Sequence, residues 1–189
     1  MEDAMKKILS VLVCMGLALS LASCGCSKSK TPTVTAVDTI SPDTLITVED
    51  ASAVAGAALL MSDDGITNDG TALSVTYVAR DMGAADPVTV RIEQFSETLP
   101  TSQVWADYEN SRLQRGDMAF IEGIGQDCFV AYPFINVYDR GCFIKISAGS
   151  GDSDAQRDML VNLATKAVSV LETMVSAEAA GETDANVIK

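Results

Sequence analysis

Residues 134–148 read FINVYDRGCFIKISA, two apolar runs separated by a short polar turn. The runs Phe134–Tyr138 and Cys142–Ala148 have the length and composition of β-strands. Between them, Asp139-Arg140-Gly141 supplies a glycine suited to a positive φ, the conformation that tight hairpin turns require. The stretch therefore predicts an antiparallel hairpin.

Four further segments of the chain are expected to be strands, at residues 73–80, 88–95, 118–122 and 127–132. In the second of them, apolar side chains alternate with polar ones, Val88, Val90 and Ile92 against Thr89, Arg91 and Glu93. Such alternation indicates an antiparallel sheet with one buried and one wet face, covered by helices on one side only.

Three helices are expected around these strands, at residues 45–60, 101–115 and 153–176. Thr47 and Asp50 have the spacing of a capping box at the start of the first helix, and the last has a strong apolar stripe. The acidic stretch 62–70 does not match the spacing of an EF-hand, so we expect an exposed loop there. The order of elements predicts a single α+β domain over residues 44–178, an antiparallel sheet with helices packed on it.

The N-terminal segment has the pattern of a secretory signal, in which two lysines precede an uncharged apolar run that ends in Leu21-Ala22-Ser23-Cys24. This box resembles that of bacterial lipoproteins, which implies a lipid on Cys24 and removal of residues 1–23. Residues 24–43 are then expected to be a flexible tether, and residues 179–189 a frayed tail. The protein is expected to be lipid-anchored at the outer face of the bacterial cell membrane. The alternative is an ordinary secretory signal in which Cys24 is incidental.

The chain is strongly acidic, with 13 basic and 26 acidic residues and a net charge of −13. Such a surface repels nucleic acid, because binding there depends on Lys and Arg neutralising phosphates. The chain contains no histidine, which excludes Ser-His-Asp and Cys-His catalysis and most zinc and haem sites. We therefore expect no catalytic residue, no metal and no cofactor.

Cys128 and Cys142 are the two cysteines of the predicted domain, and an extracytoplasmic compartment permits a disulfide between them. In a simple meander the strand 134–138 lies between them, which separates their Cα atoms by roughly two strand spacings, 9–10 Å. A disulfide needs less than about 7 Å. It forms only if the strands of the two cysteines pair directly, or if residues 132–136 loop out.

Four features of the sequence share one family pattern: Leu45–Ala51, Gly123–Cys128 before a strand, the Gly141 turn, and the terminal helix with Leu160 to Leu163. In these features the chain resembles small secreted bacterial lipoproteins and extracytoplasmic sensor domains with a PsbP-like fold. The resemblance implies a non-catalytic binding or accessory role and transfers no catalytic residue.

The function expected from the sequence is a membrane-anchored binding module for an unknown envelope ligand or protein. Its ligand is expected to meet the open sheet face or a helix–sheet cleft, with four aromatic residues as candidate contacts: Trp105, Tyr132, Phe134 and Tyr138. One alternative is a carboxylate-based envelope hydrolase, which would need paired carboxylates about 5–10 Å apart in a cleft. Another is a structural or inhibitory partner of an envelope protein, which would show a large exposed apolar patch.

Overall fold

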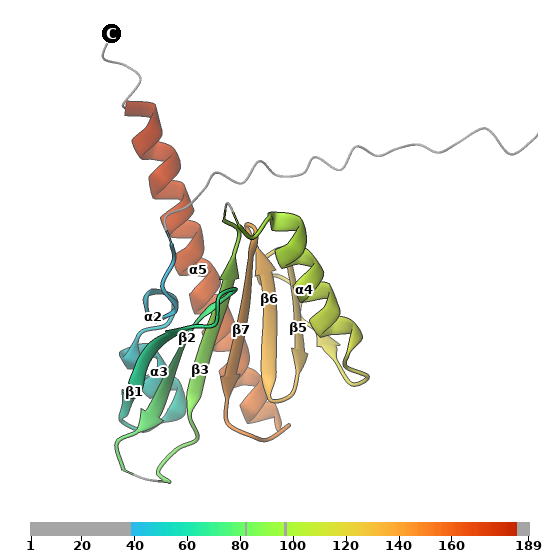
Figure 1. Ribbon diagram of the computed structural model, residues 1–189. Helices are drawn as coiled ribbons and strands as arrows, with labels where there is room; N and C mark the ends of the chain where they lie inside the picture. Colours follow the sequence, from blue (N-terminus) through green and yellow to red (C-terminus); the bar gives the residue numbers. More distant parts are fainter. Residues whose placement is uncertain (1–38, 82, 97, 185–189) are drawn as a thin grey trace, which may run out of the picture. The chain divides into compact units, whose positions relative to one another are not determined.

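The computed structural model describes residues 39–184 except 82 and 97 (Figure 1). The predicted signal segment, the lipidation site Cys24 and most of the tether lie outside the described residues. α5 extends to Asp184, beyond the end expected near residue 176, and residues 185–189 are not described.

The described part is built on one sheet of seven strands in the order β1-β2-β3-β7-β6-β5-β4 (Figure 1). All six neighbouring pairs are antiparallel. The predicted α+β class, an antiparallel sheet with helices packed on it, is confirmed. The strands are β1 Leu59–Asn68, β2 Leu73–Ala79, β3 Val88–Gln94, β4 Ala119–Phe120, β5 Asp127–Ala131, β6 Phe134–Asp139 and β7 Cys142–Ala148.

The predicted hairpin is present as β6 and β7. Asp139 pairs with Cys142, which leaves Arg140 and Gly141 as a two-residue turn with φ of 48° and 78°. Positive φ at both positions is the geometry of a type I′ turn, whose twist matches that of the flanking strands. Because β7 also pairs with β3, the hairpin joins the two halves of the sheet.

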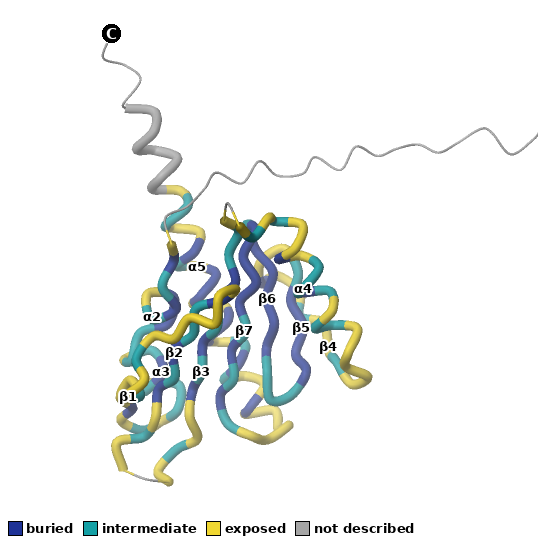
Figure 2. The backbone as a smooth tube through the Cα atoms, viewed as in Figure 1, coloured by how far each residue is buried: buried dark blue, intermediate teal, exposed yellow. Residues whose placement is uncertain are grey.

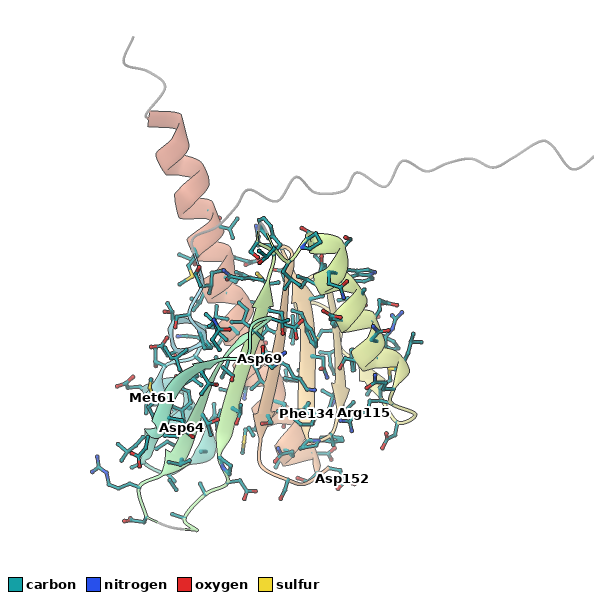
Figure 3. The ribbon with its side chains drawn as sticks, viewed as in Figure 1. Met61, Asp64, Asp69, Arg115, Phe134 and Asp152 are labelled. Carbon is teal, nitrogen blue, oxygen red and sulfur yellow. The ribbon has the colours of Figure 1, made fainter. Side chains whose placement is uncertain are left out.

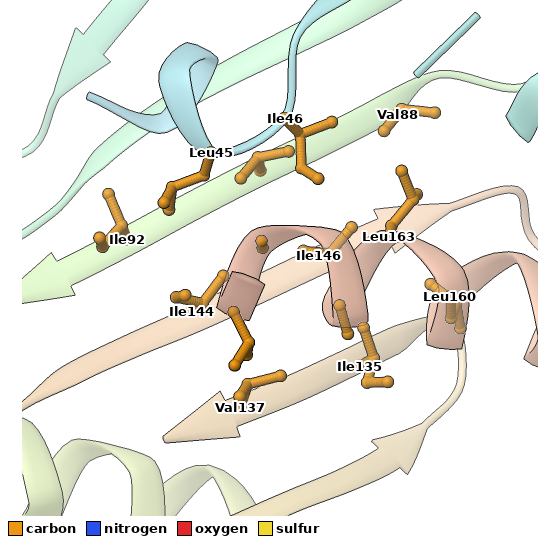
Figure 4. Close-up of a cluster of buried hydrophobic side chains, with 14 of the residues drawn as sticks. Leu45, Ile46, Val88, Ile92, Ile135, Val137, Ile144, Ile146, Leu160 and Leu163 are labelled. Atoms are coloured by element: carbon orange, nitrogen blue, oxygen red, sulfur yellow. The ribbon is translucent and has the colours of Figure 1, made fainter. Parts of the chain in front are cut away.

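One face of the sheet carries the main core, covered by α2 Pro42–Leu45, α3 Val48–Ala55 and α5 Asp154–Asp184. Figure 4 shows Leu45, Ile46 and two leucines of α5 converging on the aliphatic side chains of β3, β6 and β7. By length and composition Asp154–Ser176 could cross a membrane. Its apolar stripe is instead buried on the sheet, through Leu160, Leu163, Ala164, Ala167 and Leu171. The stripe therefore identifies α5 as the core helix of this domain.

The second face of the sheet is covered only in part, by α4 Thr101–Leu113. Val104 and Tyr108 of this helix are fully buried against an aromatic cluster of β5, β6 and β7, formed by Phe129, Tyr138 and Phe143. The expectation that helices cover one side only was therefore wrong for this part of the sheet. Beyond α4 the second face stays open, and we call this region the open face.

The first strand was not predicted. The sequence patterns predict a helix over residues 45–60 and an exposed loop over 62–70, whereas α3 ends at Ala55 and β1 begins at Leu59. The capping box at Thr47 and Asp50 is confirmed, since Thr47 Oγ1 accepts from the Asp50 N–H and Asp50 Oδ2 accepts from the Thr47 N–H. β1 is an edge strand, mostly exposed, and its register with β2 shifts between Met61 and Ile66 (Figure 2). A strand with neither a buried face nor regular alternation gives no period-2 signal.

Candidate ligand-binding face

Strand register places a row of polar side chains across the open face. Ser74 of β2 pairs with Arg91 of β3, and Arg91 with Lys145 of β7. Lys145 pairs in turn with Asn136 of β6, but Asn136 is buried beneath α4, where it accepts a hydrogen bond from Ser111, and so lies outside the open face. Neighbouring strands lie about 4.8 Å apart, so Ser74, Arg91 and Lys145 span roughly 10 Å of the sheet. We call them the cationic row.

A second row lies one step along the same strands. Thr76 pairs with Thr89, Thr89 with Ser147, and Ser147 with Phe134. The hydroxyls of Thr76 and Thr89 are 3.1 Å apart, within hydrogen-bond distance. All four residues are half-buried. We call Thr76, Thr89 and Ser147 the hydroxyl row; their hydroxyls can both donate and accept hydrogen bonds beside the cationic row.

Phe134 brings two cationic groups together, Lys145 of the cationic row and Arg115. The Lys145 ammonium lies 4.4 Å from the centroid of the Phe134 ring, and the Arg115 guanidinium carbon lies 5.7 Å from it. Arg115 follows the end of α4 and reaches the sheet beside β6, where Figure 3 labels it next to Phe134. The ring holds both cations over the open face through cation–π attraction.

The cations of this face differ in their counter-charges. Arg91 donates to Asp69 at 3.0 Å and to Glu93 at 2.8 Å. For Lys145 and Arg115, the described residues contain no carboxylate within 4.0 Å of the charged nitrogens. Partial burial lowers the pKa of Lys145, repulsion from Arg115 and Arg91 lowers it further, and the Glu93 carboxylate opposes these shifts.

The four aromatic residues predicted to contact a ligand do not form one site. Trp105 of α4 packs edge-on against Tyr138, with ring centroids 4.7 Å apart, and Tyr138 is only 8% exposed. Tyr132 packs instead against the main core, on the opposite face of the sheet. Of the four, Phe134 alone borders the cationic and hydroxyl rows, as a support for the cations.

The residues that make the open face were not singled out by sequence reasoning. Arg91 and Thr89 were assigned only to the wet side of an alternating strand. Lys145 could have been noticed in the sequence, because it is the single charged residue in the apolar run Cys142–Ala148. No sequence pattern points to Arg115, because its position beside Phe134 depends on the packing of α4.

The disulfide that the sequence left open is not formed. Cys128 and Cys142 are free, buried thiols on β5 and β7, and β6 pairs with both strands. Neither condition for a bridge is met, because the two strands are not neighbours and residues 134–139 form a regular strand. Burial raises the pKa of each thiol to about 12. The cysteines are therefore inert core residues.

Two of the cavities between the described residues lie away from the open face and contain acidic side chains. A pocket of about 800 Å³ lies between α3 and the edge of β1, lined by residues that include Glu49, Met61 and Arg80. A smaller pocket of about 290 Å³ lies beside the β6–β7 turn and is lined by Asp139 and Glu172. Within residues 39–184, without 82 and 97, no three His, Cys, Asp or Glu side chains are grouped to hold a metal ion.

The carboxylates of the smaller pocket share one guanidinium. Arg140 lies 3.4 Å from Asp139 and 3.5 Å from Glu172. Burial raises the pKa of the Asp139 carboxyl, and Arg140 opposes this shift. The arrangement is an ion-pair cluster that joins the hairpin turn to α5.

Comparison of the chain with protein-family models and curated proteins, and of its structure with solved structures, finds no match.

Proposed function

We propose that this protein is a non-catalytic binding module, lipid-anchored at the outer face of the bacterial cell membrane, whose ligand binds the open face. The observation that carries the proposal is the pair of adjacent rows, one cationic and one of hydroxyls, on the half of the sheet that α4 leaves uncovered. If these positions served only solubility, opposite charges paired with each other would be enough. Instead, the rigid strands hold hydrogen-bond donors at these positions, and Lys145 has no carboxylate partner among the described residues.

The membrane anchor is supported by the sequence. Leu21-Ala22-Ser23-Cys24 closes an apolar segment with the pattern of a lipoprotein cleavage box. A thioether-linked diacylglycerol would supply two acyl chains, enough for stable anchoring. The acidic surface would add no attraction to an anionic bilayer, so attachment would depend on the lipid.

A non-catalytic role is supported by the chemistry of the open face. Hydroxyl nucleophiles need an adjacent base, and the chain has no histidine. Among the hydrogen bonds of the described residues, none joins Lys145 to Ser147 or Thr89. A carboxylate-based hydrolase at Asp139 and Glu172 is less favoured, because Arg140 contacts both acids.

A thermal-shift screen of residues 25–189 tests the proposal, since this piece contains every buried core residue of the domain, from Ile40 to Leu171. The panel holds cell-wall fragments, sugars, peptides, lipids and Ca²⁺. A ligand at a hundredfold over its Kd adds about 2.7 kcal/mol, a shift of several degrees.

Two variants locate the binding. Thr89→Trp places bulk on the open face, and Thr173→Trp places the same bulk on an exposed position of α5. A binding module of the proposed kind loses its ligand shift in the first variant and keeps it in the second. A flat screen of folded protein, or a shift that survives in Thr89→Trp, contradicts the proposal.

A further inference from the structure

Resting on the proposed function, we infer that the open face binds a phosphate group, held by Lys145, Arg115 and Arg91 with the hydroxyls of Thr89 and Ser147. The ligand class is a phosphate ester of a small polyol. This chemistry occurs both in soluble glycerol phosphates and in the headgroups of anionic phospholipids.

The first argument is the distribution of positive charge. Residues 45–178 contain eight basic against twenty acidic side chains. Three of those eight nevertheless gather on this one face, and two of them have no carboxylate within ion-pair distance among the described residues. Placing like charges close together costs free energy. In so acidic a chain, carboxylates could easily have been placed beside Lys145 and Arg115 to neutralise them. A bound anion is the missing counter-charge.

The second argument is that these cations are held in place. The Phe134 ring contacts both Lys145 and Arg115, and salt bridges to Asp69 and Glu93 hold Arg91 through its two terminal nitrogens. Glu93 is 6% exposed and pairs with Phe143, which packs against α4, so it anchors Arg91 at the α4 side of the cationic row. Donors fixed in advance lose less conformational entropy when a ligand binds.

The third argument concerns the number of donors. Lys145 and Arg91 come from paired positions of β7 and β3, and the hydroxyls of Ser147 and Thr89 lie two residues along the same strands. With Arg115, Lys145 and the two hydroxyls make four donor groups that no carboxylate of the described residues engages, beside Arg91, whose two terminal nitrogens are held by Asp69 and Glu93. A carboxylate has two oxygens, whereas a phosphate presents three or four around a tetrahedral centre and suits Arg geometry. The hydroxyl row would also meet the hydroxyls of a polyol.

The test is titration calorimetry on residues 25–189 with inorganic phosphate, glycerol 3-phosphate and an oligo(glycerol phosphate). Co-sedimentation with phosphatidylglycerol vesicles is a separate arm. Glycerol and glutarate are the matched probes without phosphate. Phosphatidylcholine vesicles are the matched probe without net charge. Two double variants are compared. The first carries Arg115→Gln and Lys145→Met; the control carries Arg80→Gln and Arg157→Gln, which together remove the same charge at exposed sites elsewhere.

We expect the phosphate esters to bind, and the Arg115/Lys145 double variant to bind them at least about tenfold more weakly, as charge-assisted hydrogen bonds imply. The Arg80/Arg157 control should change affinity by less than about twofold, because exposed charges at a distance are screened by salt. Binding to soluble esters alone identifies a soluble ligand, and binding to the vesicles identifies the headgroup. Either result supports the inference.

Three results overturn it: no binding of any phosphate probe by folded protein, equal weakening in both double variants, or glutarate binding as tightly as glycerol 3-phosphate. If no phosphate probe binds, but a neutral ligand from the screen binds and its binding is lost in Thr89→Trp, the phosphate inference fails while the binding function stands. If nothing binds the open face, both fail.

Discussion

The hydroxyl of Tyr77 donates a hydrogen bond of 2.5 Å to the carbonyl oxygen of Ile46, and both residues are fully buried. Ile46 lies between α2 and α3, so this bond ties the start of the domain to β2. Burial raises the pKa of Tyr77 to about 12, because the phenolate would be desolvated and near three carboxylates. The hydroxyl is therefore a permanent donor at physiological pH.

Tyr77→Phe should lower the free energy of unfolding by about 1–3 kcal/mol, because the Ile46 carbonyl is left buried without its partner. Urea denaturation measures the change. Tyr132→Phe is the matched control, since its hydroxyl makes no hydrogen bond among the described residues, and it should cost less than about 0.5 kcal/mol. Equal losses in the two variants would contradict the role of the Tyr77 hydroxyl.

Cys128 and Cys142 should not react with an aromatic disulfide reagent in the native protein at pH 8, because burial raises the pKa of both thiols to about 12 and the thiolate is the nucleophile. In a Cys26→Ser background of residues 25–189, two thiols should be labelled after unfolding in urea. Intact mass before and after reduction should be equal. A mass lower by two hydrogens before reduction would mean that the cysteines are bridged.

The carboxylate of Asp69 should make stability depend on pH below about 4. Hydrogen bonds from the Thr71 and Ala72 N–H groups, with the nearby Arg91, lower the pKa of Asp69 from 3.8 to about 2. A carboxyl whose pKa is lower in the folded state stabilises above its unfolded value, and this stabilisation disappears as the pH falls through the folded value.

The Asp69→Asn variant should therefore be less stable than the parent at pH 6, with a difference that shrinks between pH 4 and pH 2. Asp64→Asn, at an exposed position of β1, is the control. Urea midpoints over this pH range measure both. A difference for Asp69→Asn that does not change with pH would exclude the ionised carboxylate as its cause.

Alanine substitutions at the two glycines before β5 should distinguish the cost of backbone strain from the cost of steric overlap. Gly123 and Gly125 both have positive φ, 81° and 61°. A Cβ at Gly123 would meet nothing within 4 Å, whereas one at Gly125 would lie 2.9 Å from Val137 Cγ1 and 3.0 Å from the Tyr138 carbonyl oxygen. Gly123→Ala should cost about 1–2 kcal/mol from strain alone.

Gly125→Ala should cost about 1–3 kcal/mol more than Gly123→Ala, because β6 must also move. Thermal unfolding of the two variants side by side provides the comparison. Equal losses of stability in the two variants would show that the segment around Gly125 can move away from β6 without cost.

Much of the fold could be predicted from short-range patterns. The β6–β7 hairpin is encoded by the turn Asp139-Arg140-Gly141, the start of α3 by Thr47 and Asp50, and the face of α5 by its apolar stripe. Each signal lies within a few residues, because turn dihedrals, capping bonds and helical periodicity are local. The strand β1 carried no such signal, since an exposed edge needs no apolar alternation.

The sequence by itself determined an α+β domain with a hairpin at its centre, behind a segment with the pattern of a lipoprotein signal. Only the tertiary structure decided which half of the second sheet face is open and which residues meet there. Lys145, Phe134 and Arg115 come from β7, β6 and the segment after α4. They meet because strand register and helix docking fix positions between segments distant in sequence, and those positions follow from the packing of the whole sheet.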